Sequence, residues 1–162
     1  MRKLITIFSV LFFLLLTVPH SFASSNFTTD YDVTYTIKDS GLTSVNFDVS
    51  LTNNTTQYYA SSYSIQVGFK DLENAKASDP DGPITPNITR ENDEQNIELT
   101  FNKRVVGINN KLNFNLSFDT KSVAKKIGRI WEVNIPGLAD QGNFQSFTIS
   151  SPSNLYAPPG TG

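Results

Sequence analysis

The stretch "SVNFDVSLT", residues 44 to 52, decides the fold class, because its side chains alternate between polar and apolar at every position. Successive side chains of a β-strand point to opposite faces of a sheet, whereas an α-helix returns to the same face after about 3.6 residues. The alternation therefore predicts a strand with one face in water and one buried face, on which Phe47 lies.

The same pattern recurs along the chain. It predicts further strands at 33–37, 63–69, 97–101, 112–118, 131–135 and 147–149, and less clearly at 72–77 and 84–89. Turn-forming residues separate these strands at 38–41, 79–82, 91–96 and 107–110. No long helical pattern supplies the crossovers that a parallel sheet needs. We therefore expect an all-β fold, an antiparallel β-sandwich of the immunoglobulin-like or a related kind with about seven to nine strands.

The parity of the alternation also predicts the core. The inward side chains are expected to include Phe47, Tyr59, Tyr63, Val67, Phe114, Phe118 and Trp131. Tyr59 belongs to this set if its strand begins near residue 59, and Tyr58 then points outward. The alternative for the tyrosines is a carbohydrate-stacking platform, and for Trp131, the only tryptophan, an exposed ligand-stacking ring.

One short segment has helical features. Residues 122–128, "SVAKKIG", place Ser122 as a cap, two lysines late and Gly128 as a terminator. They predict a helix of at most about two turns that connects two strands.

The amino terminus has the order of a secretory signal peptide. Arg2 and Lys3 precede a largely apolar run of 15 residues over 4–18, which small residues follow. An uncleaved anchor is the alternative, but the run is shorter than the roughly 20 residues that span a bilayer. We expect an exported protein with a signal peptide over 1–23, cleaved between Ala23 and Ser24, a β-sandwich domain over 24–150 and a Pro- and Gly-rich tail or linker over 151–162.

Composition excludes several chemistries. The sequence has no cysteine, and its single histidine, His20, lies in the signal peptide. Cys-His and Ser-His-Asp sites and typical zinc sites are therefore excluded from the mature chain, and we expect no catalytic residue and no cofactor. Of 13 basic residues 11 remain after cleavage, against 15 acidic ones, a charge of −4. Nothing favours nucleic acid as a partner, and we expect no stable membrane insertion by the mature domain.

The only metal-like pattern is "SDPDG" at 78–82. Asp79 and Asp81 stand two residues apart before a glycine, a fragment of the spacing found in calcium loops. A full loop needs further oxygen ligands, so an ordinary turn is the competing interpretation.

Three segments carry a family resemblance. In this order and spacing, "YDVTYTI" (31–37), "VSLTNNTTQYYASSYSIQVG" (49–68) and "AKKIGRIWEVNIPGL" (124–138) resemble the amino-terminal extracytoplasmic β-rich region of bacterial transglutaminase-like membrane proteins. The resemblance implies a leading domain that precedes a papain-like catalytic core and a membrane segment. The catalytic Cys, His and Asp of that core have no counterpart here.

The resemblance therefore implies a non-catalytic accessory domain that scaffolds such a core, as a short product or as a fragment of a longer chain. The partners it implies are a carboxy-terminal catalytic domain or a cell-surface protein or glycan. The alternative is a free-standing adhesion or glycan-binding module. A carboxylate hydrolase is disfavoured, because nearly every acidic residue falls in a turn or on the polar face of a strand.

Overall fold

The computed structural model describes residues 26–91, 94–136 and 143–150. The expected signal peptide, its cleavage site between Ala23 and Ser24, and the expected tail over 151–162 lie outside these residues. None of the described residues forms a helix long and apolar enough to cross a membrane.

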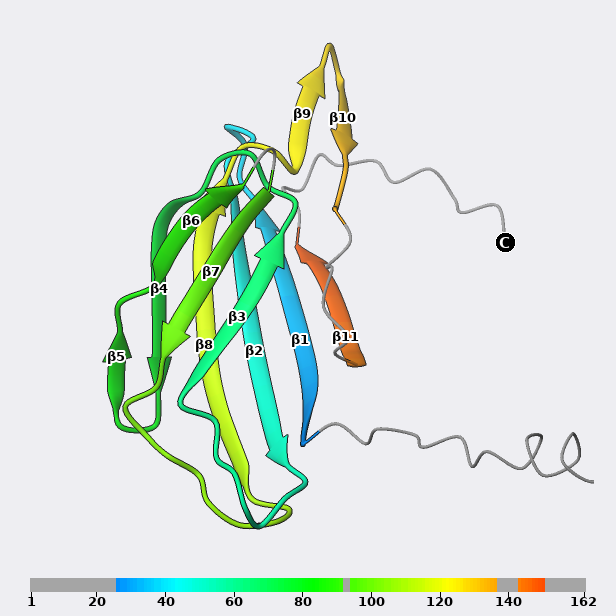
Figure 1. Cartoon of the computed structure of the whole chain (residues 1–162). Helices are drawn as coiled ribbons and strands as arrows, with labels where there is room; N and C mark the ends of the chain where they lie inside the picture. Colours follow the sequence, from blue (N-terminus) through cyan, green and yellow to red (C-terminus); the bar gives the residue numbers. More distant parts are fainter. Residues whose placement is uncertain (1–25, 92–93, 137–142, 151–162) are drawn as a thin grey trace, which may run out of the picture.

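Two β-sheets pack face to face (Figure 1). The large sheet has the strand order β11-β1-β2-β8-β4-β5, and the small sheet has the order β3-β7-β6. The large sheet contains β1 (Phe27–Ile37), β2 (Thr43–Asn53), β4 (Glu73–Asp79), β5 (Gly82–Ile84), β8 (Lys111–Thr120) and β11 (Asn143–Ser150). The small sheet contains β3 (Ser62–Val67), β6 (Asn87–Glu91) and β7 (Glu94–Thr100). The predicted all-β sandwich is confirmed.

A third strand pair, β9 (Ala124–Ile127) and β10 (Ile130–Val133), belongs to neither sheet. It projects as a hairpin beyond one end of the sandwich (Figure 1). With it the described residues form eleven strands, more than the sequence predicts. The additional strands arise because the segment expected at 84–89 divides into β5 and β6, and because β9 stands where a helix was expected.

Almost every strand pair is antiparallel, as expected, with β2 pairing to β1 on one side and to β8 on the other. The exception among the described strands is β11, which pairs with β1 in parallel. A tight turn cannot join parallel neighbours. Here the rest of the sandwich lies between β1 and β11 in the chain, and β11 covers the outer edge of β1.

The alternating pattern fills the space between the two sheets. Phe47, Val67, Phe114 and Phe118 are buried in one apolar cluster, where the sequence places them. The ring of Phe118 lies 6.0 Å from that of Phe47 and 5.4 Å from that of Phe69, measured between centroids. Each phenylalanine buried in this way stabilises the fold by about 1.5–3 kcal/mol.

The expected helix over 122–128 is wrong. Residues 124–127 form β9, which pairs with β10 from Ala124 opposite Val133 to Ile127 opposite Ile130. Gly128, with φ of +63°, opens the hairpin turn instead of ending a helix. A segment this short cannot offset the cost of helix nucleation by itself, whereas a two-residue turn is enough to join β9 to its partner strand β10.

The central core position expected for Trp131 is also wrong. Trp131 is half-buried and lies on β10, outside the core cluster. It packs over Gly41 in the β1–β2 turn, where an added Cβ would lie 3.4 Å from the Trp131 ring and 3.2 Å from the carbonyl oxygen of Ala124. Trp131 therefore seats the hairpin on the end of the sandwich.

Candidate functional site

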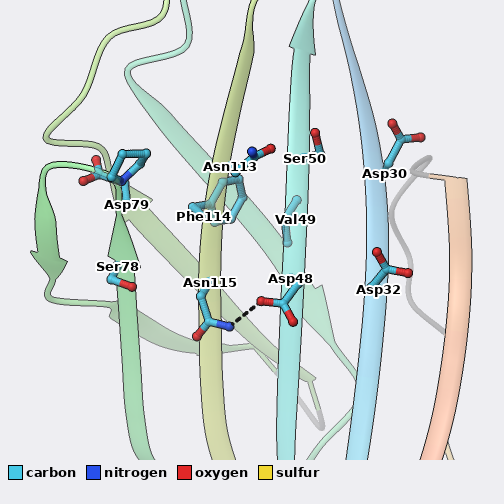
Figure 2. A pocket seen from close by; sticks show the side chains of 11 residues that line it. Asp30, Asp32, Asp48, Val49, Ser50, Ser78, Asp79, Asn113, Phe114 and Asn115 are labelled. Carbon is cyan, nitrogen blue, oxygen red and sulfur yellow. Dashed lines mark hydrogen bonds between the residues drawn. The ribbon is translucent and has the colours of Figure 1, made fainter.

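The outer face of the large sheet carries a row of polar side chains across four strands (Figure 2). Asp32 lies opposite Asp48, Asp48 opposite Asn115, and Asn115 opposite Ser78. With Asp30 and Ser50 in the neighbouring row, these residues line a shallow depression of about 460 Å³. Its position on the solvent side of the sheet follows from the same alternation that buries the core.

Hydrogen bonds hold the two facing carboxylates of this row. Ser146 Oγ donates to Asp32 Oδ1 at 2.6 Å, while Asn115 Nδ2 and Asn46 Nδ2 each donate to Asp48 at 2.9 Å. Like charges directly opposite each other on a sheet repel, and these donors offset the repulsion. In the described ranges no group of three or more His, Cys, Asp or Glu is placed to hold a metal ion. We interpret the row as a hydrogen-bonded solvent face.

Asp79, at the end of β4, is buried and holds a distant loop. Its carboxylate accepts hydrogen bonds from the backbone N–H of Asn102 at 2.7 Å, of Lys103 at 2.9 Å and of Asp81 at 3.0 Å. Burial alone would raise the pKa of Asp79, but these hydrogen bonds outweigh it and hold that pKa below its ordinary value. The carboxylate therefore remains ionised and ties residues 102–103 to the β4–β5 turn.

The two residues of the calcium pattern do not converge on a common point. The Asp79 oxygens accept from N–H groups, while the half-exposed Asp81 carboxylate lies 4.0 Å from Lys103 Nζ. Because three backbone N–H groups already donate to the Asp79 carboxylate, its oxygens have little capacity left to coordinate a cation. The structure thus favours the turn interpretation of 78–82 over a calcium loop.

Asn53, at the end of β2, is a second buried polar residue at the same end of the molecule. Its Nδ2 donates to the carbonyl oxygen of Tyr58 at 2.7 Å, and its Oδ1 accepts from the N–H of Thr55 at 2.9 Å. Its backbone N–H donates to Asn110 O, and its carbonyl accepts from Asn109 N. Asn53 therefore joins the loop 54–61 to the loop 101–110. We call these two loops, with the β4–β5 turn at 79–82, the loop end.

Tyr58 and Tyr59 are both exposed at the loop end, by 55% and 44% of their surface. Tyr58 is exposed as expected, although not through the alternation of a strand, and the inward orientation expected for Tyr59 is wrong. β3 begins only at Ser62, so the alternation does not extend back to Tyr59. The guanidinium of Arg104 lies 5.3 Å from the centroid of the Tyr59 ring, a cation–π contact.

Tyr63, the third tyrosine of this stretch, lies inside β3 and is half-buried against the core. Its ring stands 5.1 Å from that of Phe114, and its hydroxyl is hydrogen-bonded to the Tyr31 hydroxyl. The inward orientation expected for Tyr63 agrees with these contacts, and its polar tip finds a partner at the rim of the core.

The loop end also exposes two aliphatic side chains, Val106 and Ile108. Sequence reasoning missed both, although three apolar residues in "VVGIN" are more than a turn requires. Arg104, the two exposed tyrosines and these aliphatic groups all lie on the two loops that Asn53 joins. Aromatic residues and arginine are enriched at protein contacts.

Comparisons with known proteins give little further information. No family model matches the sequence, and no curated protein matches it. A similar solved structure is a substrate-bound mutant of an M1 zinc metallopeptidase from Deinococcus radiodurans, with a TM-score of 0.44 and 12% identity. The alignment covers 67% of this chain and only 24% of that chain. A similarity at this level carries no argument about function.

Proposed function

We propose that this chain is a non-catalytic, exported β-sandwich domain that scaffolds a transglutaminase-like surface protein and contacts its partner through the loop end. The observation that carries the proposal is the exposed set of Tyr58, Tyr59, Val106 and Ile108 on loops that are tied to the sandwich.

The buried polar groups make this surface suitable for binding. Asn53 holds the backbone at Tyr58, and Asp79 holds the start of the loop that carries Val106. A surface that is already ordered loses less conformational entropy when a partner binds. Tyrosine and arginine are also among the residues that contribute most to binding at interfaces.

The family resemblance supports the same assignment. Its three segments form β1, the β2–β3 region with Tyr58 and Tyr59, and the β9–β10 hairpin. They therefore include one loop of the loop end, 54–61, and the hairpin that projects beyond the other end of the sandwich (Figure 1).

The first experiment asks what the natural polypeptide contains. An antibody raised against the sandwich would isolate the protein from the extracytoplasmic fraction, and mass spectrometry would read its peptides. We expect peptides of a papain-like core with its Cys, His and Asp. A natural polypeptide that carries no such core would overturn the transglutaminase part of the proposal.

The second experiment measures the contact itself. The core, expressed separately, is titrated with the sandwich by calorimetry. Tyr58→Ala with Val106→Ser should weaken association roughly tenfold or more, because interface aromatic groups each contribute on the order of 1–2 kcal/mol or more. Asn113→Ala, on the exposed outer face of the large sheet, is the matched control and should leave the affinity unchanged.

A glycan-binding module is the second candidate, and the adjacent exposed rings of Tyr58 and Tyr59 favour it. Aromatic faces stack on sugar rings. In a cell-wall pull-down, this function requires that Tyr58→Ala abolishes binding while Val106→Ser retains it. A protein contact through the loop end would instead be weakened by both substitutions.

A further inference from the structure

The β9–β10 hairpin has properties that the proposed scaffold does not use. It projects from the end of the sandwich opposite to the loop end, since β8 runs from one end to the other before the hairpin begins (Figure 1). Every residue from 125 to 130 is exposed. The tip is therefore available to a partner.

The two faces of the hairpin differ. Lys126 pairs with Trp131, and Ile127 pairs with Ile130. Because neighbouring residues of a strand point to opposite faces, the two isoleucines lie on the face away from Trp131, which packs over Gly41 of the sandwich. Ile127 is 55% exposed and Ile130 is 71% exposed. The face with Trp131 packs on the sandwich, and the opposite face exposes the paired side chains of Ile127 and Ile130 to solvent.

The hairpin is also cationic on an acidic protein. Over 124–133, Lys125, Lys126 and Arg129 stand against the single acid Glu132, a net charge of +2. The whole sequence has a formal charge of −2, so the remainder carries −4. Lys126 lies over the Trp131 ring at 5.6 Å. Glu132 lies opposite Lys125 in the hairpin, but among the described residues neither Lys125 nor Arg129 forms an ion pair within 4.0 Å.

We propose that the tip of the β9–β10 hairpin docks on an anionic lipid surface. Ile127 and Ile130 enter the interfacial region, while Lys125 and Arg129 contact lipid phosphates. Exposed apolar side chains beside basic ones are the combination that binds peripheral proteins to anionic membranes. The charge distribution favours this occupant over an uncharged partner, since a negative surface attracts the tip and repels the rest of the molecule.

This docking would also orient the molecule. The hairpin end would face the membrane and the loop end would face away from it, because the two lie at opposite ends of the sandwich (Figure 1). The exposed tyrosines would then remain available while the hairpin is bound. The inference does not depend on the proposed scaffold function.

The test is cosedimentation of the exported chain with lipid vesicles. Binding is expected to phosphatidylglycerol-rich vesicles and to be roughly tenfold or more weaker to pure phosphatidylcholine. Raising the salt concentration should weaken it further, because screening acts on exposed charges. Equal affinity for the two lipids, or binding to neither, would overturn the proposal.

Two variants locate the contact. Ile127→Ser with Ile130→Ser should lower the affinity for anionic vesicles roughly tenfold or more, since two aliphatic side chains no longer enter the lipid. Lys125→Glu with Arg129→Glu should lower binding to anionic vesicles and leave binding to phosphatidylcholine unchanged. Circular dichroism and thermal melting of both variants serve as the control that each of them is folded.

Val106→Ser with Ile108→Ser is the matched control, because it removes two exposed aliphatic side chains from the loop end. It should leave vesicle binding unchanged. An equal loss in the control would show that the hairpin is not the lipid contact. If the hairpin variants change the oligomeric state in gel filtration and not vesicle binding, the hairpin joins two copies of the chain and the lipid proposal is wrong.

Discussion

The two ends of the sandwich both expose apolar side chains, but they are built differently. At the loop end, the buried side chain of Asp79 binds the backbone of a loop that is distant in sequence, and that of Asn53 binds the backbone of the loop that directly follows it. At the hairpin end, two strands pair only with each other and rest on the sandwich through Trp131 over Gly41. The loops of the loop end are therefore fixed by buried side chains, whereas the hairpin is attached to the sandwich only at its base. The exposed fraction of a side chain does not distinguish these two kinds of surface.

An aspartate contributes to each end, one before β4 and one at its last residue. Asp71 accepts from the N–H of Lys121 at 2.7 Å and from Thr120 Oγ1 at 3.1 Å, close to the base of the hairpin. Asp79 accepts from Asn102 and Lys103 at the loop end. Asp79 is buried and Asp71 only half-buried. The loop end should therefore depend more strongly on its aspartate.

The largest expected effect is that of Asp79→Ala. It leaves the N–H groups of Asn102 and Lys103 without their charged acceptor, so unfolding should cost about 2–3 kcal/mol less. Urea unfolding measures this loss. Asp81→Ala, two residues away and half-exposed, is the control and should change stability by less than about 0.5 kcal/mol. Equal effects of the two substitutions would mean that Asp79 does not hold the loop.

Asn53→Ala should have the next largest effect, a loss of about 1–2 kcal/mol, because the carbonyl of Tyr58 and the N–H of Thr55 lose their partner. Hydrogen exchange should accelerate over 54–61 and remain slow in β8. The matched variant is Asn46→Ala on the outer face, where water replaces the lost contact. Unchanged exchange in the loop would contradict the fixed loop end.

At the hairpin end, Gly41→Ala tests the contact between the β9–β10 hairpin and the β1–β2 turn. Gly41 has φ of +85°, and an added Cβ would crowd the Ala124 carbonyl oxygen at 3.2 Å and contact the Trp131 ring at 3.4 Å. We expect a loss of about 1–2 kcal/mol from the left-handed backbone, with Trp131 fluorescence shifted to longer wavelength. Gly82→Ala, also at positive φ but with open space around the added Cβ, separates backbone strain from contact with the ring. If the Trp131 emission shifts equally in both variants, the packing of Trp131 over Gly41 does not hold the hairpin.

Sequence patterns predicted the sheets well and the hairpin poorly, for one physical reason. Alternation shows which side chains share a face, and it does not show what covers that face. For Phe47 and Phe118 the cover is the opposite sheet. For Trp131 the same parity is correct, but its strand pairs outside both sheets and the ring packs over the β1–β2 turn instead of the core.

In this stretch parity was sufficient only inside a strand, as for Tyr63 in β3. Tyr59 was misplaced because its loop is bent by a hydrogen bond from Asn53 before β3 begins. The role of Asp79 depends on partners that lie far along the chain, at 102–103, and the backbone of Asn53 likewise bonds to that of 109–110. Local spacing contains no information about such contacts, and the pattern at 78–82 indicated only a turn or a fragment of a calcium loop.

The smallest expected effect is in acid, where the two aspartates should act in the same direction. Hydrogen bonds outweigh burial at Asp71 as at Asp79, so the folded state lowers the pKa of both. Their stabilising contribution is therefore fully present above the ordinary carboxyl pKa of about 4 and is lost as the pH falls through the lowered values.

The difference in urea midpoint between the wild type and Asp79→Asn should accordingly shrink as the pH is lowered from neutrality towards 2. The asparagine cannot ionise, so the variant lacks this part of the pH dependence. Asp71→Asn should show the same trend with a smaller amplitude, because its carboxylate is closer to solvent. A gap between wild type and Asp79→Asn that stays constant over this range would show that the ionised carboxylate is not what holds the loop end together.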